Sequence, residues 1–204
     1  MAPKPRSTLR EYVEAALWAL VLTLFLRAFV IQAFRIPSES MRDTLLVGDF
    51  LFVNKFEYGP KIPFTHVRLP GLRAPRRGDV IVFQFPQDPS KDFIKRCIAT
   101  GGQTLQVTDK QVAVDGEKLN EPYAIHTDPS VRPAGFEFRD NYGPYTVPAG
   151  ELFMMGDNRD NSNDSRYWGP LRMDLVKGRA MFIYWSWDGN RSWPRWNRLL
   201  QVIH

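Results

Sequence analysis

The chain contains one long apolar segment, which runs from Ala15 to Phe34 and carries a single charge, Arg27. An α-helix of ~20 such residues crosses the ~30 Å hydrocarbon core of a bilayer. An arginine is costly at the bilayer centre, whereas near a helix end its side chain can reach the lipid–water interface. The segment therefore predicts one transmembrane helix over residues 11–30, with Arg27 close to the face where the chain leaves the membrane.

Basic residues before this segment predict its orientation. Lys4, Arg6 and Arg10 precede the apolar run, and short positively charged N-terminal segments stay in the cytoplasm. We therefore expect residues 1–10 in the cytoplasm and residues 31–204 on the outer side of the cytoplasmic membrane.

Two other interpretations of the apolar segment remain open. A cleaved signal peptide carries a small-x-small site after its apolar core, and the exit sequence from Arg27 to Val30 contains none. A buried helix of a soluble protein is the second alternative. The stretch from Ala15 to Leu26 has Thr23 as its only polar residue, so it is apolar on all sides, which favours lipid surroundings.

The composition limits the classes of function. Without the anchor, ~170 residues remain, which is enough for one domain with its own core. The net charge of +5 suits anionic lipid as well as nucleic acid, but the basic residues are scattered, so we expect no nucleic-acid partner. Cys97 is the only cysteine, which excludes an intramolecular disulfide and a cysteine-based zinc site.

Beyond Phe34 the hydrophobic pattern changes to short β-type runs separated by turn residues. The run 79–85 is apolar on both faces, as in a buried strand, and Asp115-Gly116 is a typical hairpin turn pair. The predicted strands are 49–56, 79–85, 93–99, 104–108, 111–114, 145–147, 152–155 and 180–187, and one helical turn is expected at 174–177. The sequence therefore predicts a mainly β fold, with one N-terminal helix followed by an all-β domain of folded antiparallel sheets and a smaller, variable β subdomain at about 104–148.

A serine lies just beyond the predicted membrane exit, in the sequence Pro37-Ser38-Glu39-Ser40-Met41. A serine hydroxyl needs a base to act as a nucleophile at neutral pH. The histidines of the chain are His66, His126 and His204, and none lies in a predicted core strand, so a Ser-His-Asp triad is disfavoured. Ser40 with Asp43 also resembles a helix capping box, which is the structural alternative for this serine.

Lysine is another candidate base if burial lowers its pKa by several units. Within the predicted strand 93–99, Lys95 shares one face with Phe93 and Cys97. The alternative is that Lys95 protects the edge of a sheet against aggregation. From this strand alone, the two interpretations remain open.

The third notable segment, residues 156–169, reads GDNRDNSNDSRYWG. Its density of Asp, Asn and Ser predicts a tightly hydrogen-bonded turn network. A calcium loop with oxygen ligands at Asp160, Ser162 and Asp164 is disfavoured, because Leu171 stands where the closing glutamate belongs and Ser165 where the central glycine belongs. No metal site is therefore expected.

These segments occur together in one known family. The sequences PSESM, DFIKR and GDNRDNSNDSRYWG, in this order, resemble bacterial type I signal peptidases, the membrane-bound enzymes that remove signal peptides from exported proteins. Supporting similarity is found in RGDVIVFQFP, at 77–86, and VAVDGEKLNEPY, at 112–123. The resemblance runs from the anchor to the C-terminal region.

The resemblance implies a serine endopeptidase with a Ser-Lys dyad, no cofactor, signal-peptide-bearing preproteins as partners and attachment to a phospholipid membrane, working as a monomer. Substrates of the family carry small residues at the first and third positions before the cut. Ser40 corresponds to the nucleophile and Lys95 to the general base. The other implied site residues are Ser38 in the oxyanion hole; Ser162, which orients Lys95; the ion pair Asp164 and Arg166; Arg96 after the lysine; and Phe34, Ile36 and Ile94 in the substrate pockets.

The sequence departs from the family pattern near the site. Asp43 stands where the family usually has proline, and Ala99–Gln103 replaces a common Gly-Leu-Pro-Gly-Asp. These departures leave open a specialised peptidase that processes a single partner, and an inactive anchored binding module. A repressor-type Ser-Lys protease is disfavoured, since the chain has an anchor and no helix-turn-helix segment.

The C-terminal region is rich in tryptophan and arginine. These residues suit contact with a membrane interface, and packing of the tryptophans under the sheet is an equal alternative. The residues concerned are Trp185, Trp187, Trp193, Trp196, Arg191, Arg195 and Arg198.

Overall fold

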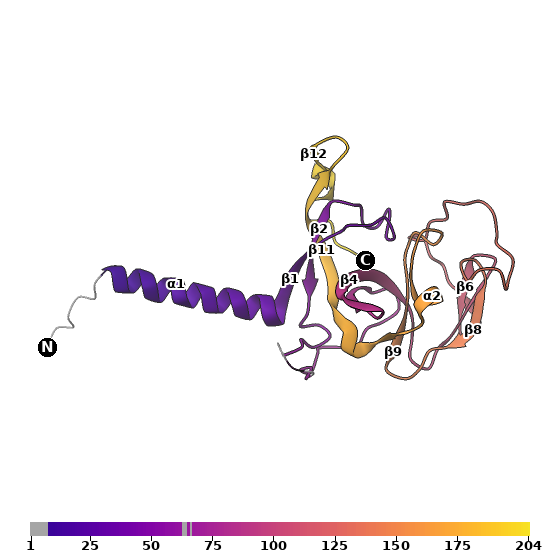
Figure 1. The fold of residues 1–204 in the computed structure, drawn as a ribbon, viewed down its shortest axis with the longest axis horizontal. Helices are drawn as coiled ribbons and strands as arrows, with labels where there is room; N and C mark the ends of the chain where they lie inside the picture. The colour runs from indigo at the N-terminus through magenta and orange to yellow at the C-terminus, as the bar shows by residue number, and fades with distance from the viewer. Residues whose placement is uncertain (1–7, 63–64, 66) are drawn as a thin grey trace.

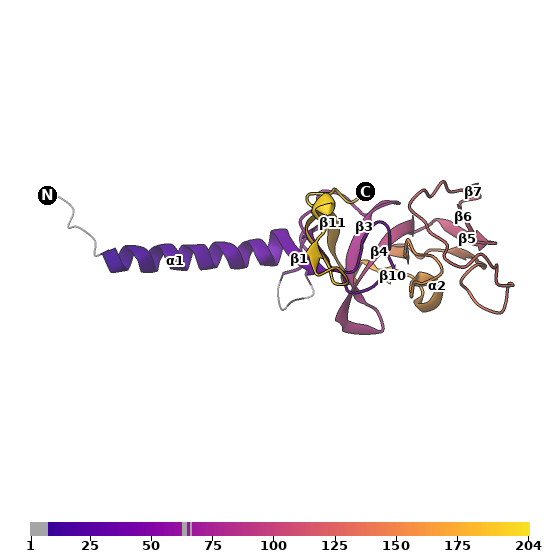
Figure 2. The same cartoon turned by 90° about the horizontal axis from the view of Figure 1, so that it is seen from above.

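A computed structural model describes residues 8–62, 65 and 67–204. Lys4 and Arg6, predicted to be cytoplasmic, and His66 lie outside the described residues. Figures 1 and 2 show a long helix that leads into a body built of strands. The predicted mainly β fold with one apolar N-terminal helix is confirmed.

The anchor consists of α1 (Thr8–Phe25) and a π-helical turn, η1 (Leu26–Val30), and none of its residues is buried in the protein. Together they form a helix of 23 residues, and the mean hydropathy of its most apolar 18-residue window is 1.9. At 1.5 Å per residue this helix is ~35 Å long, enough to cross a bilayer. Lys55 ties its end to the domain, because its Nζ donates to the backbone oxygens of Arg27 (2.9 Å) and Ala28 (3.5 Å).

The chain enters the main sheet directly from the helix. Strand β1 (Ile31–Arg35) pairs with β2 (Asp49–Asn54) in antiparallel fashion. The sheet has the order β1-β2-β11-β3-β4-β9-β10, with β12 paired to β11. The remaining strands are β3 (Val80–Phe85), β4 (Asp88–Thr100), β9 (Glu151–Met155), β10 (Leu171–Arg172), β11 (Val176–Asp188) and β12 (Trp193–Pro194).

A second sheet lies at the end of the body away from the anchor (Figure 1). Its strand order is β7-β6-β5-β8. The apolar residues of this sheet pack against Phe153 and Met155 of β9 in a second hydrophobic cluster. The strands are β5 (Thr104–Thr108), β6 (Gln111–Val114), β7 (Glu117–Lys118) and β8 (Tyr142–Thr146). They fall in the region predicted as a smaller subdomain.

The predicted strands agree with β5 and β6 and differ elsewhere mainly at their ends. Strand β4 begins at Asp88, before the predicted start, because its first residues are exposed and polar and give no apolar alternation. The sequence missed β1, the two-residue strands and the short helices α2 (Ser165–Trp168) and η3 (Trp196–Arg198). The expected helical turn at 174–177 is η2 (Met173–Leu175), and Lys177 already belongs to β11.

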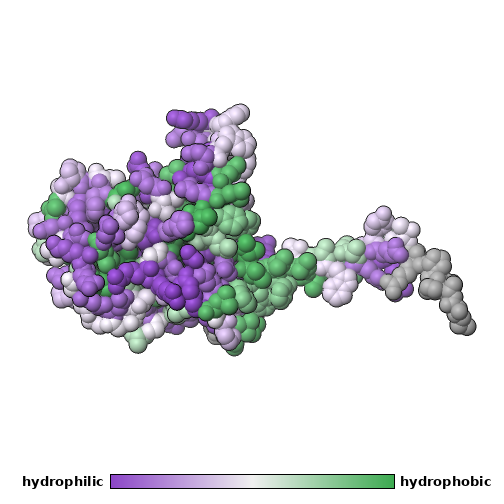
Figure 3. Space-filling view, turned by 180° about the vertical axis from the view of Figure 1, so that it is seen from behind, coloured by the Kyte–Doolittle hydropathy of each residue, from purple (hydrophilic) through white to green (hydrophobic). Residues whose placement is uncertain are grey.

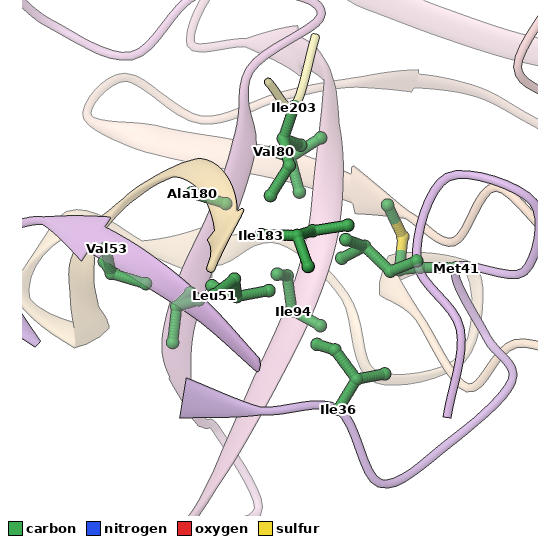
Figure 4. Packing of buried hydrophobic residues seen from close by; sticks show 11 residues of the cluster. Ile36, Met41, Leu51, Val53, Val80, Ile94, Ala180, Ile183 and Ile203 are labelled. Carbon is green, nitrogen blue, oxygen red and sulfur yellow. The ribbon is translucent and has the colours of Figure 1, made fainter. Parts of the chain in front are cut away.

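The loop between β1 and β2 is held by apolar side chains on both sides of Ser40. Met41 and Leu45 are only 1% and 0% exposed, and Ile36 is equally buried. Burying one such side chain stabilises the fold by ~1.5–3 kcal/mol. Figure 4 shows how Ile36 and Met41 pack in one cluster with residues of β2, β3, β4, β11 and the C-terminal segment, which are Leu51, Val53, Val80, Ile94, Ala180, Ile183 and Ile203.

The tryptophans near the C-terminus are largely exposed. Trp187, Trp193 and Trp196 expose 39%, 63% and 57% of their surface, so packing under the sheet does not describe these three. The expected interfacial position of Arg198 is wrong, because its buried guanidinium binds Asp49, with 2.7 Å between Nη2 and Oδ2.

Candidate active site

Ser40 lies in the β1–β2 loop and is almost completely buried. The segment after β9 fixes the backbone of this loop. The backbone N–H of Asn158 donates to the Ser40 oxygen (3.1 Å), and the Asn158 side chain donates to the Glu39 oxygen (3.2 Å). Two consecutive carbonyl groups are thus turned toward Asn158, which sets the orientation of the Ser40 hydroxyl.

Lys95 lies in the middle of β4, and its ammonium nitrogen reaches the loop. Its Nζ donates to Ser40 Oγ at 2.6 Å and to the backbone oxygen of Ile94 at 3.1 Å. The side chain is 4% exposed, and Nζ lies 5.2 Å from the ring centroid of Phe93. The edge-strand interpretation of Lys95 is wrong, because β4 is paired with β3 on one side and with β9 on the other.

The surroundings of Lys95 favour its neutral form. Burial lowers the pKa of Lys95 to about 8, while the carboxylates of Asp164 and Asp157 act in the opposite direction. At pH 7 about one tenth of the amines would then be neutral, far more than for a free lysine. A neutral amine at hydrogen-bond distance from a hydroxyl can act as its general base.

Ser38 is an exposed residue of the β1–β2 loop that carries Ser40. Its Oγ is 3.5 Å from Ser40 Oγ, at the limit of a hydrogen bond. A hydroxyl in this position lies beside the reacting oxygen and can turn toward a negative charge that develops there.

Ser162 differs from the expectation. Its Oγ is buried and, within residues 8–62, 65 and 67–204, forms no hydrogen bond. The predicted bond to Lys95 is therefore not formed, and the two acceptors of Lys95 Nζ are Ser40 Oγ and the Ile94 carbonyl. Ser162 packs against Gly156.

The ion pair between Asp164 and Arg166 is present and buried, with 2.8 Å between Nη2 and Oδ2. Arg166 also donates to the backbone oxygens of Arg139 (2.5 Å) and Arg159 (2.7 Å), and Asp164 accepts the N–H of Gly156 (3.1 Å). Burial alone would raise the pKa of Asp164, but the charge and hydrogen bonds of Arg166 hold it below its usual value. The predicted turn network therefore exists, with this pair at its centre.

Arg96 connects β4 to the β1–β2 loop through Asp157 and Thr44, two residues that the sequence did not single out. Its guanidinium binds both oxygens of Asp157, at 2.9 and 2.7 Å, and lies 3.9 Å from the ring centroid of Tyr123. Asp157 also accepts the hydroxyl of Thr44 at 2.6 Å. Asp157 lies in the polar segment 156–169, but its partners Thr44 and Arg96 are 113 and 61 positions away in the sequence.

Two of the oxygen ligands expected for a calcium loop in residues 156–169 have basic partners instead. The carboxylate of Asp160 binds Lys110 at 3.1 Å, and that of Asp164 binds Arg166. The described part of the chain contains no group of His, Cys, Asp and Glu side chains that could hold a metal ion. Within that same part, the side-chain partners of Ser40 Oγ are Lys95 and Ser38, and no histidine is among them.

Asp43 is not a helix cap and has an unusual backbone. The loop around it is a series of turns, and Asp43 has φ of 72°. Proline cannot adopt this value, since its ring fixes φ near −65°. The departure from proline is therefore accompanied by a different local backbone, and the capping-box interpretation of Ser40 is wrong.

A groove extends from the dyad toward the expected pocket residues. One cavity of about 450 Å³ touches Ser38, Ser40 and Lys95, and a smaller one of about 60 Å³ touches Phe34, Ile36 and Ile94. Both also contact Asp92 and Phe93 of β4. The structure thus brings Ser40, Lys95 and the three expected pocket residues to one continuous surface.

Gly156 allows the close approach of these segments. A Cβ at this position would lie 2.5 Å from the Ser40 backbone oxygen and collide with Ser162 Oγ. We expect Gly156→Ala to displace the nucleophile loop and lower kcat/KM about 10²-fold, since a shift of ~1 Å can cost that much.

The turnover rate of the purified variant tests this effect. Gly189→Ala is the matched control, because its Cβ would meet nothing within 4 Å. Equal activity of the two variants would contradict the tight contact.

Comparison with known proteins gives a consistent result. The family model described as "Signal peptidase, peptidase S26" matches residues 9–185. Signal peptidase I of Pseudomonas aeruginosa is 35% identical, with 95% of this chain and 79% of the relative aligned. Signal peptidase I of Leptolyngbya laminosa is 38% identical over 90% of this chain and 83% of the relative.

A solved structure was also found. Signal peptidase I from Enterococcus faecalis is 27% identical to this chain, covers 52% of it and 97% of its own length, and has a TM-score of 0.42.

Proposed function

Since the chain belongs to the signal peptidase family, peptidase S26, we propose that it removes signal peptides from preproteins with Ser40 as nucleophile and Lys95 as general base. The chain is accordingly a membrane-anchored serine endopeptidase. The observation that carries the assignment of roles is the 2.6 Å contact between Lys95 Nζ and Ser40 Oγ in a buried site.

The reaction is acyl transfer. Neutral Lys95 takes the hydroxyl proton of Ser40 as Oγ bonds to the scissile carbonyl carbon, and the resulting oxyanion is held by the backbone N–H of Ser40 and the hydroxyl of Ser38. Such a donor is worth ~2.7–4 kcal/mol in the transition state. Lys95 then gives the proton to the leaving amine, the C–N bond breaks, and water hydrolyses the ester with Lys95 again acting as base.

The network around the dyad has a positioning role in this proposal. Arg96 holds β4 to the nucleophile loop, and the pair Asp164 and Arg166 holds the turn that carries Ser162. Ser162 lies against Gly156, whose neighbours orient the Ser40 backbone.

The groove suits a substrate with small side chains. The small cavity beside Phe34, Ile36 and Ile94 has room for a small side chain such as that of alanine. The substrate segment would add as an extended strand, with backbone hydrogen bonds for affinity and this pocket for selectivity. Such a pocket would select a small side chain at one of the positions before the cut.

The proposal also assigns each part of the chain a position relative to the membrane. Residues 11–30 span the cytoplasmic membrane once, residues 1–10 remain in the cytoplasm, and the chain from residue 31 onward works outside as a monomer. Figure 3 shows apolar surface gathered on the part of the body next to the anchor. Trp187 of β11, Trp193 of β12 and Trp196 of η3 are exposed and suit the interface.

Cleavage of a preprotein with an Ala-x-Ala site in liposomes tests the function. We expect the wild type to cut after the second alanine and Ser40→Ala to lose at least ~10⁴-fold in rate. Ser130→Ala, at an exposed serine, is the control and should retain activity. A folded wild type that leaves several general preproteins intact but cuts one partner would favour the specialised peptidase.

The pH dependence tests the base. Because only neutral Lys95 can accept the proton, and burial sets its pKa at about 8, kcat/KM should rise about tenfold per pH unit below this value and level off above it. The profile is measured with a peptide substrate in detergent. An inflection near ~10.4, the value of a free lysine, is incompatible with the proposed base.

A further inference from the structure

A polar cavity lies where the anchor joins the domain. Its volume is about 190 Å³, several times the ~30 Å³ of a water molecule. It is built from the end of the anchor, β1, the chain after β2, β3 and the start of β11. The lining residues are Ala28, Gln32, Lys55, Lys61, Gln84, Val176 and Lys177.

The charged side chains that line this cavity are all positive. Lys55, Lys61 and Lys177 line it, and within the described ranges its lining contains no carboxylate. Lys177 binds Asp92 at 2.7 Å, outside the lining. Among the residues that the structure describes, Lys61 has no side-chain hydrogen bond or ion pair. Burial and the charges of Lys177 and Arg27 lower the pKa of Lys55, so these cations lie close enough to repel one another.

The position of the cavity sets its depth in the membrane. The spanning helix ends at Val30, and Ala28 of its last turn forms part of the cavity wall. Lys55 caps the same turn through the carbonyls of Arg27 and Ala28. The end of a membrane-spanning helix lies at the level of the lipid headgroups, so the three lysines face the phosphate layer rather than bulk water.

We propose that this cavity binds the phosphate of an anionic phospholipid. Lysine ammonium groups are point donors suited to phosphate oxygens, and basic pockets beside membrane helices bind lipid headgroups in this way. Gln32 and Gln84 add neutral donors for the oxygens of the headgroup. The glycerol backbone and acyl chains would follow the outer surface of η1 into the bilayer. The assignment rests on the anchor spanning the membrane and not on the peptidase mechanism.

Native mass spectrometry of the full chain in detergent micelles tests the site, with phosphatidylglycerol and phosphatidylcholine added in equal amounts. We expect the wild type to retain phosphatidylglycerol about tenfold over phosphatidylcholine, and the double variant Lys55→Gln, Lys61→Gln to retain the two equally. Glutamine keeps a donor for the carbonyls that Lys55 binds. Lys177 is left unchanged, because it contacts Asp92 and Phe34 of the groove.

The double variant Lys91→Gln, Lys118→Gln is the matched control, since it removes the same charge from exposed positions. Unchanged phosphatidylglycerol retention in the Lys55, Lys61 variant, or no preference in the wild type, would overturn the proposal. Displacement of the lipid by an equal concentration of inorganic phosphate would also overturn it, in favour of a free-phosphate site. Peptide cleavage in phosphatidylcholine micelles should be equal for wild type and variant, which separates this test from that of the dyad.

Discussion

Replacing Lys95 with methionine is expected to abolish peptide cleavage and at the same time to stabilise the fold. Methionine fills a similar volume but cannot accept the Ser40 proton, so the rate should fall at least ~10⁴-fold. Burial lowers the pKa of Lys95 from 10.5 to about 8, so at pH 7 the folded state holds this proton less tightly than the unfolded state. The variant should gain about 1–3 kcal/mol in free energy of unfolding after loss of the hydrogen bonds of Lys95.

The pH dependence of this stabilisation follows from the same shift. The penalty on the charged lysine is complete below pH 8 and disappears as the pH rises through 10.5, where the unfolded state also loses the proton. The advantage of Lys95→Met should therefore shrink between these values. Thermal unfolding in detergent at several pH values measures it.

Lys91→Met is the control for Lys95→Met, because Lys91 lies on the same strand but is 67% exposed. It should alter neither activity nor stability appreciably. A Lys95→Met variant that is clearly less stable than the wild type would mean that the lysine has a structural role instead.

Asp157→Asn is expected to produce the largest loss of stability. Asp157 and Arg96 are 0% and 2% exposed, so removing the carboxylate charge leaves a buried guanidinium unpaired. Breaking such a pair costs ~3–5 kcal/mol. Activity should also fall, because Asp157 accepts the Thr44 hydroxyl beside the nucleophile loop. Denaturant unfolding and cleavage rates measure the two effects.

The double variant Arg96→Met, Asp157→Asn distinguishes an unpaired charge from a general loss of packing. It removes the buried guanidinium as well, so about half of the lost stability should return. Activity should stay low, because the bonds from Arg96 to the backbone oxygens of Gly78 and His204 are also gone. A double variant that is less stable than Asp157→Asn would contradict the role of the unpaired charge.

Much of the site was predicted because three segments, PSESM, DFIKR and GDNRDNSNDSRYWG, together resemble one family, whereas Ser40 and Lys95 each left an alternative open when taken alone. The Ser40 loop, the Lys95 strand and the turn network at 156–169 each stand out in the sequence, and the structure brings all three together. Asp157 and Thr44 were missed, since neither position carries a local signal of its partner. The predicted hydrogen bond between Ser162 and Lys95 is absent, because hydrogen bonds depend on side-chain orientation in three dimensions, which the sequence pattern does not specify.

From its own residues the sequence predicted the apolar N-terminal helix and the mainly β class, and its resemblance to a known family supplied the candidate roles of the site residues. Hydrophobic periodicity and turn chemistry act over a few neighbouring residues, so they are readable without the fold. Only the tertiary structure decided that Lys95 lies on a strand paired on both sides and reaches Ser40 across 55 positions of sequence. It also decided that Lys55, Lys61 and Lys177 line one cavity beside the end of the anchor. The physical reason is that strand register and side-chain packing depend on contacts between distant segments, which no local pattern encodes.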